Sequence, residues 1–185
     1  MDNIITEHLR GFKIQFETKA GVFSKVGLDA GTRLLVENMQ VQNGTLVADL
    51  GCGTGVIGFV AAKLNPTGYI HLLDVNIRTV KLAEVNTDLN ELKNVEVFLS
   101  DLFSAVGSRT YHLILSNPPL QLGNEFLEEA AKECFDHLKP KGRVYWVVQK
   151  HLKPLIQRYF EKQFGNCEVV ATGKGHVVFR SIKNG

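Results

Sequence analysis

Short apolar runs alternate with amphipathic stretches along most of this chain. Runs rich in Val, Ile, Leu and Phe predict strands over residues 46–49, 69–73, 95–99, 112–116, 143–149, 167–172 and 176–182. Apolar residues that recur every three or four positions predict helices over residues 56–64, 77–92, 126–138 and 152–164. The last two strands are joined by Gly173-Lys174-Gly175, as expected of a hairpin. The pattern predicts a doubly wound α/β fold with a mostly parallel, seven-stranded sheet that ends in an antiparallel hairpin.

The first 45 residues are expected to form a short β/α extension, a lid on a core at residues 46–185. Phe12, Ile14 and Phe16 alternate with polar residues over 11–18, which is typical of a half-buried strand. Asp29 is expected to cap a helix that follows it. No internal repeat or low-complexity linker divides the chain, so residues 1–185 are expected to form one domain.

Three glycines stand between the strand and the helix of residues 46–64. Their spacing is G-x-G-x-G, with Asp49 two positions before the first, at Gly51, Gly53 and Gly55. Glycine permits the positive-φ backbone of a tight turn and lets a ligand lie against the main chain. The stretch therefore predicts a cradle for a nucleotide-type ligand.

Polar residues follow several predicted strands. Asp74 comes 21 residues after Gly53, where a carboxylate can bind both hydroxyls of a ribose. In doubly wound sheets, ligands lie beyond the carboxyl ends of the strands. One rim is therefore predicted to carry Asp49, Asp74, Asp101 and Asn117.

The composition is that of a globular protein, with 44% hydrophobic and 22% charged residues. No apolar run approaches the roughly 20 residues that span a membrane, and the mixed polarity of residues 1–11 argues against a signal peptide. Cys52, Cys134 and Cys167 show no paired spacing, so we expect free thiols in the cytoplasm and no metal site.

The basic residues concentrate toward the C-terminal end, although the net charge is only +2. Residues 139–185 hold ten Lys and Arg against two Glu, a balance of +8, so the preceding residues carry −6. Such asymmetry suggests a face that binds a polyanion, while a solvated helix surface accounts equally well for Lys153, Arg158 and Lys162.

Three separated motifs resemble those of class I S-adenosylmethionine-dependent methyltransferases. Residues 49–55 read D-L-G-C-G-T-G, residues 116–119 read S-N-P-P, and residues 18–24 and 28–32 read T-K-A-G-V-F-S and L-D-A-G-T. The pattern is similar to the "methyltransferase small domain" group, which includes guanine 2-amino methyltransferases of small-subunit ribosomal RNA. The resemblance covers nearly the whole chain and implies a single methyltransferase domain with a Rossmann-like fold.

The resemblance also implies S-adenosylmethionine as the cofactor. Asp49 would face its ammonium group, Asp74 its ribose and Asp101 its adenine amine, with Asn76 and Ile77 beside the adenine. Structural alternatives are that Asp49 anchors the turn and that Asp101 caps the segment after it. The implied cofactor-binding residues are Asp49, Gly51, Cys52, Gly53, Gly55, Asp74, Asn76, Ser100, Asp101 and Asn117.

Asn117, Pro118 and Pro119 match the N-P-P signature of enzymes that methylate planar nitrogens, and the resemblance makes them the catalytic residues. A ring-conjugated amine is a poor nucleophile because its lone pair is delocalised. An Asn side-chain oxygen and a Pro carbonyl can each accept one amine hydrogen, which favours charge developing on the nitrogen and holds it in line. A turn or a helix start would account for the same residues.

One position departs from this pattern. Such enzymes often carry an aromatic residue after N-P-P that stacks on the target ring, and the ribosomal guanine enzymes tend to show Phe-His, whereas this chain has Leu120-Gln121. Leu120 is assigned to the substrate site by position. Phe23 is the candidate for stacking on the base, with core packing as its alternative.

Three functions remain open. The first is an RNA methyltransferase acting on an exocyclic amine, with guanine of small-subunit ribosomal RNA as the expected target. The second is a protein-glutamine methyltransferase, which shares N-P-P but usually has Tyr where this chain has Leu120. The third is a non-catalytic cofactor- or RNA-binding module, which would be expected to lack the glycines or Asn117. The sequence favours the first, with RNA as partner, and leaves the oligomeric state open.

Overall fold

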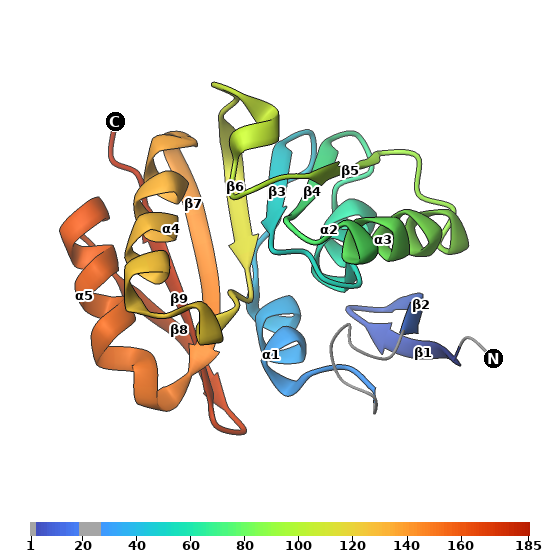
Figure 1. The fold of residues 1–185 in the computed structure, drawn as a ribbon, viewed down its shortest axis with the longest axis horizontal. Helices are drawn as coiled ribbons and strands as arrows, with labels where there is room; N and C mark the ends of the chain where they lie inside the picture. Colours follow the sequence, from blue (N-terminus) through green and yellow to red (C-terminus); the bar gives the residue numbers. More distant parts are fainter. Residues whose placement is uncertain (1–2, 19–26) are drawn as a thin grey trace.

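A seven-stranded sheet runs through the centre of the molecule in the order β5-β4-β3-β6-β7-β9-β8 (Figure 1). The structure is a computed structural model and describes residues 3–18 and 27–185. Strands β5, β4, β3, β6 and β7 are parallel, and β9 runs antiparallel to β7 and β8. The predicted mostly parallel sheet with its C-terminal hairpin is confirmed. The strands are β3 (Leu46–Leu50), β4 (Tyr69–Asp74), β5 (Val95–Leu99), β6 (Tyr111–Ser116), β7 (Leu138–Gln149), β8 (Glu168–Gly173) and β9 (His176–Ile182).

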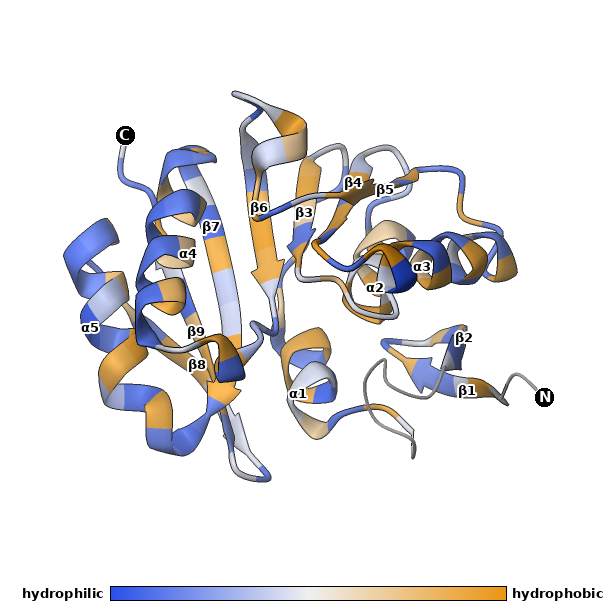
Figure 2. Cartoon of the chain, viewed as in Figure 1, coloured by the Kyte–Doolittle hydropathy of each residue, from blue (hydrophilic) through white to orange (hydrophobic). Residues whose placement is uncertain are grey.

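Helices cover both faces of the sheet. Strand residues point alternately to the two faces, so Val47 joins one core and Ala48 the other. Figure 2 shows hydrophobic central strands and polar residues on the outer surfaces of the helices. One face of the sheet is covered by α1 (Ala30–Asn38), α2 (Val56–Leu64) and α3 (Ile77–Leu89). The other face is covered by α4 (Asn124–Asp136) and α5 (Lys153–Phe164). The short 3-10 turns are η1 (Ser104–Val106), η2 (Leu120–Leu122) and η3 (Lys150–Leu152). None of the described helices has the length and apolarity needed to cross a bilayer.

The carboxyl ends of the parallel strands lie along one edge of the sheet, called the rim below. Leu50 pairs with both Leu73 and Ser116 across the neighbouring strands. Strand β7 continues past Trp146, the partner of Ser116, and ends at Gln149. Helix α1 and the tip of the β8–β9 hairpin lie at this same end of the molecule (Figure 1). The topology therefore brings the polar residues that follow β3, β4, β5 and β6 to one place.

The N-terminal segment forms a hairpin that the sequence predicts only in part. β1 (Asn3–Leu9) pairs antiparallel with β2 (Phe12–Thr18), whereas the apolar alternation predicts only a strand over residues 11–18. In β1, Leu9 is buried while Ile4 is 50% exposed. The burial of β1 alternates, but Ile4 lies on the exposed face and Glu7 on the inward face, so the sequence of this strand lacks the apolar alternation that marks a half-buried strand.

Two buried asparagines, one in α3 and one at its C-cap, close the free edge of β2. The side chain of Asn90 accepts from the Gln15 amide at 2.9 Å and donates to the Gln15 carbonyl at 2.6 Å. Asn86 makes the same pair of bonds with Glu17, at 2.7 and 3.3 Å, and also donates to the Thr54 carbonyl at 3.0 Å. These amides satisfy the backbone groups that a neighbouring strand would otherwise satisfy, and they tie the hairpin to the centre of the fold.

Three elements have boundaries that differ clearly from the pattern. Helix α3 ends at Leu89, with Asn90 as its C-cap, where periodicity predicts a helix to residue 92. Helix α4 spans Asn124–Asp136 where periodicity predicts residues 126–138, and β7 already begins at Leu138 where a break is predicted at residues 139–142. The Lys141 amide donates to the Lys183 carbonyl at 2.7 Å, and the Lys183 amide to the Gly142 carbonyl at 2.9 Å. Pairing with the C-terminal segment thus extends the strand through residues that are typical of a turn.

Candidate active site

The glycines after β3 form a turn in left-handed backbone, called the glycine turn below. Gly51, Gly53 and Gly55 have φ angles of 69°, 56° and 95°, a region that favours glycine. The Gly51 and Cys52 amides both donate to the Leu73 carbonyl, at 2.8 and 3.0 Å. These bonds hold the turn against β4.

Two of the glycines leave room for a ligand, and the third makes room for packing. A Cβ at Gly53 would meet nothing within 4 Å, and one at Gly51 would meet only Pro119, at 3.9 Å. A Cβ at Gly55 would lie 2.4 Å from the Phe59 ring. Gly51 and Gly53 therefore present bare backbone to open space, as a cofactor cradle requires.

Asp74 ends β4 beside this open space. Its Oδ2 accepts from the Gly53 amide at 3.1 Å and its Oδ1 from the Asn76 amide at 2.9 Å. Burial raises the pKa of Asp74 above its ordinary value, against these amide hydrogen bonds. Each carboxylate oxygen keeps a further lone pair, so both can still accept from a pair of ribose hydroxyls.

Asp49 lies behind the glycine turn and borders no cavity of the site. Its side chain is fully buried; Oδ2 accepts from the Gly58 amide of α2 at 2.9 Å, and Oδ1 has no partner among the described residues. Burial raises the pKa of Asp49 to about 7, against the hydrogen bond from Gly58 and with a smaller push from the charge of Asp74. This geometry supports the anchoring role, and contact with the ammonium group of a cofactor stays a prediction.

A cavity of about 490 Å³ opens at the rim in front of the glycine turn. Its lining falls into two groups that follow the order of the sheet, with Asn117 between them. The β4 side, from the ends of β3 and β4, the turns after β3, β4 and β5, and α3, comprises Leu50, Gly51, Gly53, Leu73, Asp74, Val75, Asn76, Thr79, Ser100, Asp101 and Leu102. The β7 side, from β6, β7, η2 and α4, comprises Ser116, Pro118, Pro119, Gln121, Leu122, Phe126, Ala130 and Trp146.

A smaller cavity of about 60 Å³ shares Gly51, Gly53 and Asn117 with the first. Cys52 lines the smaller cavity but not the larger one. Burial raises the pKa of its thiol well above the ordinary range, so the thiol stays protonated at neutral pH. The cavity borders the main chain of the glycine turn at Gly51, Cys52 and Gly53. Its other lining residues are Phe16, Thr18, Gly27, Leu28, Asp29, Thr32, Thr54, Val56 and Ile57.

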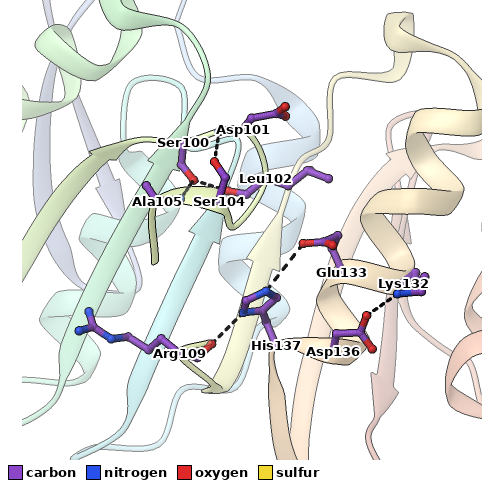
Figure 3. A network of polar contacts seen from close by, with 10 residues as sticks. All are labelled: Ser100, Asp101, Leu102, Ser104, Ala105, Arg109, Lys132, Glu133, Asp136 and His137. Atoms are coloured by element: carbon purple, nitrogen blue, oxygen red, sulfur yellow. Dashed lines mark hydrogen bonds and ion pairs between the residues drawn. The ribbon is translucent and has the colours of Figure 1, made fainter. Parts of the chain in front are cut away.

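Ser100 and Asp101 follow β5 and play different parts. The buried Ser100 hydroxyl donates to the Leu102 carbonyl at 2.7 Å and accepts from the Ala105 amide at 3.1 Å. Asp101 contacts Ser104 through its main chain only, at 3.0 and 3.1 Å. Figure 3 shows the Asp101 carboxylate pointing away from these contacts. The capping role considered for Asp101 thus belongs to Ser100, and the carboxylate is exposed at the edge of the cavity.

The residues after Asp74 differ by one position from the expected pair beside the adenine. Asn76 lines the cavity and caps α3 by accepting from the Arg78 amide at 2.9 Å. Ile77 begins α3 and is not part of the lining, whereas Val75, 64% exposed, is. Val75 therefore takes the position predicted for Ile77.

Asn117 stands where the two cavities meet. Its Nδ2 donates to Asp29 Oδ2 at 2.9 Å and to Thr32 Oγ1 at 3.1 Å. Its Oδ1 accepts no hydrogen bond from the described part of the chain. The preceding Ser116 is anchored as well, since its hydroxyl donates to the Leu50 carbonyl at 2.7 Å.

Asp29 and Thr32 are two residues of the site that the sequence pattern does not assign to it. The pattern assigns Asp29 only the role of helix cap, which it also fills, since its Oδ2 accepts from the Thr32 amide at 2.9 Å. The L-D-A-G-T run is the one signal that sets these residues apart.

The two prolines line the large cavity beside Asn117. The Pro119 carbonyl accepts from the Leu122 amide at 3.2 Å, whereas the Pro118 carbonyl accepts no hydrogen bond within residues 3–18 and 27–185. The Asn117 side chain and the Pro118 carbonyl thus supply two neighbouring acceptors without partners in the described structure.

Leu120, predicted in the substrate site, does not line the large cavity. Its side chain is half-buried against the core under α4 and α5, and the next residues, Gln121 and Leu122, line the cavity in its place. The η2 turn produces this difference, because consecutive residues of a 3-10 turn point in different directions. Phe23 lies outside the described residues, so its part in stacking stays a prediction, while Phe126 of α4 lines the β7 side.

The site fits S-adenosylmethionine in its chemistry. Gly51 and Gly53 offer open backbone, and Asp74 keeps lone pairs for a ribose. Within the described ranges, no three His, Cys, Asp or Glu side chains gather as a metal site.

Comparison with known proteins agrees with this geometry. The profile of the family described as "Methyltransferase small domain" matches residues 13–180. The "Uncharacterized protein YbxB" of Bacillus subtilis is 36% identical over 180 residues, which cover 95% of this chain and 89% of that protein. The "Ribosomal RNA large subunit methyltransferase G" of Erwinia tasmaniensis is 32% identical over 182 residues, which cover 95% of this chain and 48% of that protein.

Among solved structures, the T. thermophilus 16S rRNA N2 guanine methyltransferase (RsmC), in complex with AdoMet and guanosine, shares the fold with a TM-score of 0.87 at 22% identity. The match covers 98% of this chain and 50% of that one, so the chain spans about half the length of each of these two ribosomal RNA enzymes. The family profile and the relatives together confirm the predicted family and its cofactor, S-adenosylmethionine: the chain belongs to the methyltransferase small domain family of S-adenosylmethionine-dependent methyltransferases.

Proposed function

We propose that this chain methylates the exocyclic amino group of a nucleobase in RNA, with guanine of ribosomal RNA as the target. One observation carries the proposal: Asn117 Oδ1 and the Pro118 carbonyl are neighbouring acceptors, unpartnered in the described structure, on a cavity that borders the glycine turn. A primary amine has two hydrogens to donate, so it matches this pair of acceptors.

The two acceptors favour transfer of a methyl group to nitrogen. When bound, S-adenosylmethionine would supply an electrophilic methyl group and would keep the electron pair of the broken S–C bond as a neutral thioether. As the amine nitrogen forms its new bond to carbon, it gains positive charge, and its hydrogens bind Asn117 and Pro118 more tightly than in the ground state. The same hydrogen bonds hold the nitrogen lone pair in one direction. One proton then leaves the nitrogen for solvent at the open rim.

The β4 side and the glycine turn would hold the cofactor. The bare backbone of Gly51 and Gly53 would lie against it, Asp74 would accept from its ribose hydroxyls, and Asp101 would accept from its adenine amine. Asp101 is exposed and Asp74 is partly buried, so the assigned ribose contact is the better shielded of the two.

The β7 side would hold the base. Phe126, Leu122 and Pro119 supply apolar surface, and the side-chain amide of Gln121 can both donate and accept along a base edge. Leu122 is 53% exposed, so it can cover a ligand that enters from solvent. A base turned out of its strand would then stack on Phe126, which would take the part of the aromatic residue that follows N-P-P in related enzymes.

The fold divides the basic C-terminal portion between the two ends of the sheet. Lys150, Lys153 and Lys174, called the rim lysines, lie beyond the carboxyl end of β7, where the Lys150 amide donates to the Gly175 carbonyl of the hairpin tip at 2.9 Å. All three are exposed and form no ion pair with the described residues. Lys141 lies at the opposite end of β7.

The rim lysines would bind the phosphates next to the methylated base. A strand advances about 3.3 Å per residue, so the end of β7 lies roughly 10 Å beyond the level of Ser116. That distance is about the spacing of one or two nucleotides, which long lysine side chains can span. Basic residues at the amino end of the sheet would take no part.

Methyl transfer to separate substrate classes tests the proposed function. Radiolabelled S-adenosylmethionine is incubated with the chain and, in turn, with naked ribosomal RNA, small subunits, large subunits and protein extract. Label recovered in N2-methylguanosine after nuclease digestion supports the proposal, and the subunit that accepts it identifies the RNA. Label confined to protein, or to another nucleoside, would overturn the assignment of the substrate.

Charge reversal tests the RNA-binding face. Replacing Lys150, Lys153 and Lys174 by Glu should weaken binding of a fluorescent single-stranded RNA at least tenfold and reduce the dependence of log K on log salt by about 2, since each phosphate contact contributes about 0.7. A matched variant replaces three exposed basic residues at the amino end of the sheet by Glu, at Lys93, Arg109 and Lys141. Equal losses in both variants would show that this face has no special part.

A further inference from the structure

We infer that Asp29 is a positioning residue that fixes the direction of the Asn117 side-chain amide, so that only an acceptor faces the substrate amine. The inference rests on the proposed function, because it assigns a task to the residue that holds Asn117. The oxygen and the NH2 group of the Asn117 amide are nearly identical in shape, but only the oxygen can accept from an amine.

The amide of Asn117 has two orientations of almost the same shape. A half-turn about its last bond exchanges the oxygen and the NH2 group at little steric cost. In one orientation Oδ1 is available to an amine hydrogen; in the other, two donors face each other and the attacking nitrogen gains nothing. The surroundings of Asn117 therefore decide whether the side chain favours or opposes methyl transfer.

Asp29 selects the orientation of the Asn117 amide because a carboxylate has no hydrogen to donate. The group 2.9 Å from Asp29 Oδ2 must be the NH2 group of Asn117. Thr32 cannot make the choice alone, since the hydroxyl 3.1 Å away can either donate or accept. The charge of the carboxylate makes the selecting hydrogen bond the stronger of the two.

The two cavities show on which side each end of the amide lies. Asp29 and Thr32 line the small cavity and not the large one, whereas Asn117 lines both. The NH2 group is thus held toward the small cavity, and Oδ1 is left for the large cavity, which Pro118 also lines.

Asp29 is itself held in place, which a positioning residue requires. The same Oδ2 that binds Asn117 accepts from the Thr32 amide at 2.9 Å and caps α1. Helix α1 buries Leu35 and Val36 in the core. One carboxylate oxygen therefore joins the start of this helix to a catalytic side chain 88 residues away in the sequence.

Two substitutions at this position separate capping from positioning. Ser caps a helix as well as Asp does, but its oxygen lies one bond closer to the main chain and is too short to hold Asn117 as well. Asn can place a single amide oxygen where Oδ2 lies and keep both hydrogen bonds. Asp29→Ser should lower kcat for RNA methylation about tenfold and leave the Kd of S-adenosylmethionine within twofold. Asp29→Asn should restore kcat to within about threefold of the unsubstituted chain.

Thr32→Val is the comparison variant, because it removes Oγ1 but leaves the carboxylate that selects the orientation. Its loss of kcat should be clearly smaller than that of Asp29→Ser. The double variant Asp29→Ser/Asn117→Ala should be no slower than Asn117→Ala, since the first residue acts only through the second. A further tenfold loss in the double variant would overturn the inference, as would weaker cofactor binding as the main effect of Asp29→Ser.

A measurement without turnover keeps the inference apart from the proposed function. The side-chain NH2 signal of Asn117 in 15N NMR spectra should be protected from hydrogen exchange in the unsubstituted chain and in Asp29→Asn, and unprotected in Asp29→Ser. Protection that persists in Asp29→Ser would overturn the inference even if the chain methylates RNA. If the NMR result holds but Asn117→Ala keeps full activity, the proposed function fails while the orienting contact stands.

Discussion

The two sides of the rim cavity are built by different means. On the β4 side, main-chain hydrogen bonds hold the ligand-facing groups, with the Gly51 and Cys52 amides on Leu73 and the Asp74 carboxylate on the Gly53 amide. On the β7 side, the η2 turn and α4 contribute apolar side chains whose positions depend on packing.

This difference determines which side of the cavity tolerates substitution. Hydrogen bonds are directional, so the β4 side accepts one kind of ligand and loses it when a single partner is removed. Apolar packing is not directional, so the β7 side can accept a new base or side chain through one or two substitutions. We therefore expect substrate range to be determined on the β7 side.

Among these variants, Asp74→Ala should have the largest effect, a loss of cofactor affinity on the β4 side. It removes the carboxylate proposed to accept two charge-assisted hydrogen bonds from the ribose, each worth about 1.5–3 kcal/mol, and should weaken cofactor binding at least about 100-fold. Calorimetric titration with S-adenosylmethionine measures the change. Circular dichroism of the variant checks that loss of the hydrogen bond between Asp74 and Gly53 has not unfolded the chain. Unchanged affinity would contradict the ribose assignment.

Asn117→Ala tests the boundary between the two sides. Methyl transfer should fall by roughly 100-fold, the usual cost of removing one oriented group that stabilises the transition state, while cofactor affinity stays within a few-fold. The thermal midpoint should change little, because the side chain is only partly buried at the rim. Parallel losses of cofactor affinity and activity would place Asn117 with the cofactor instead.

Asp49→Asn should stabilise the folded chain above neutral pH, because it removes a buried charge behind the glycine turn. The folded pKa of Asp49, about 7, lies above its ordinary value of 3.8, so the folded state binds the proton more tightly. The resulting stabilisation is complete below pH 3.8 and is lost as the pH rises through 7. Asn keeps an acceptor for the Gly58 amide without the charge, so the variant should be more stable at pH 8 by roughly 2–4 kcal/mol.

Denaturant unfolding of the cofactor-free chain and of Asp49→Asn, from pH 4 to pH 8, measures this difference. The two curves should converge near pH 4, where the native carboxyl is protonated. A difference that stays constant across the range would show that burial of the charge has no part in it.

Phe126→Ala probes the β7 side and should have the smallest effect. Stacking of a base on an aromatic ring contributes about 1–3 kcal/mol, so binding of RNA should weaken roughly tenfold without a change in cofactor affinity. Leu120→Ala is the matched control, because Leu120 packs on the same core but does not line the cavity. The control should lower thermal stability and leave RNA binding unchanged. The opposite pattern would return Leu120 to the substrate site.

The β4 side could be predicted from the sequence because its signals are local. Glycine spacing and an acid at a strand end report the backbone conformation of Gly51 and Gly53 and the place of Asp74 directly. The parallel sheet followed from the same alternation of apolar runs, whereas the pairing of Lys141 with Lys183 extends β7 through residues that locally favour a turn.

The β7 side could not be predicted in the same way. Whether Leu120 or Leu122 faces the ligand depends on how η2 turns after Pro119, which no periodicity reports over so few residues. The bond between Asp29 and Asn117 joins positions 88 residues apart, and only the packed fold brings them together. Packing and long-range polar contacts decide this half of the site.

Asn86 and Asn90 also impose an order of events while the chain is being made. The edge of β2 that they cover precedes them by 69 and 75 residues, so the N-terminal hairpin leaves the ribosome long before its partner helix. At the usual rate of about 5–20 residues per second, the edge stays uncovered for roughly 4–15 s. An uncovered strand edge can pair with another chain. The arrival of α3 ends this interval, during which the nascent protein is most open to misassembly.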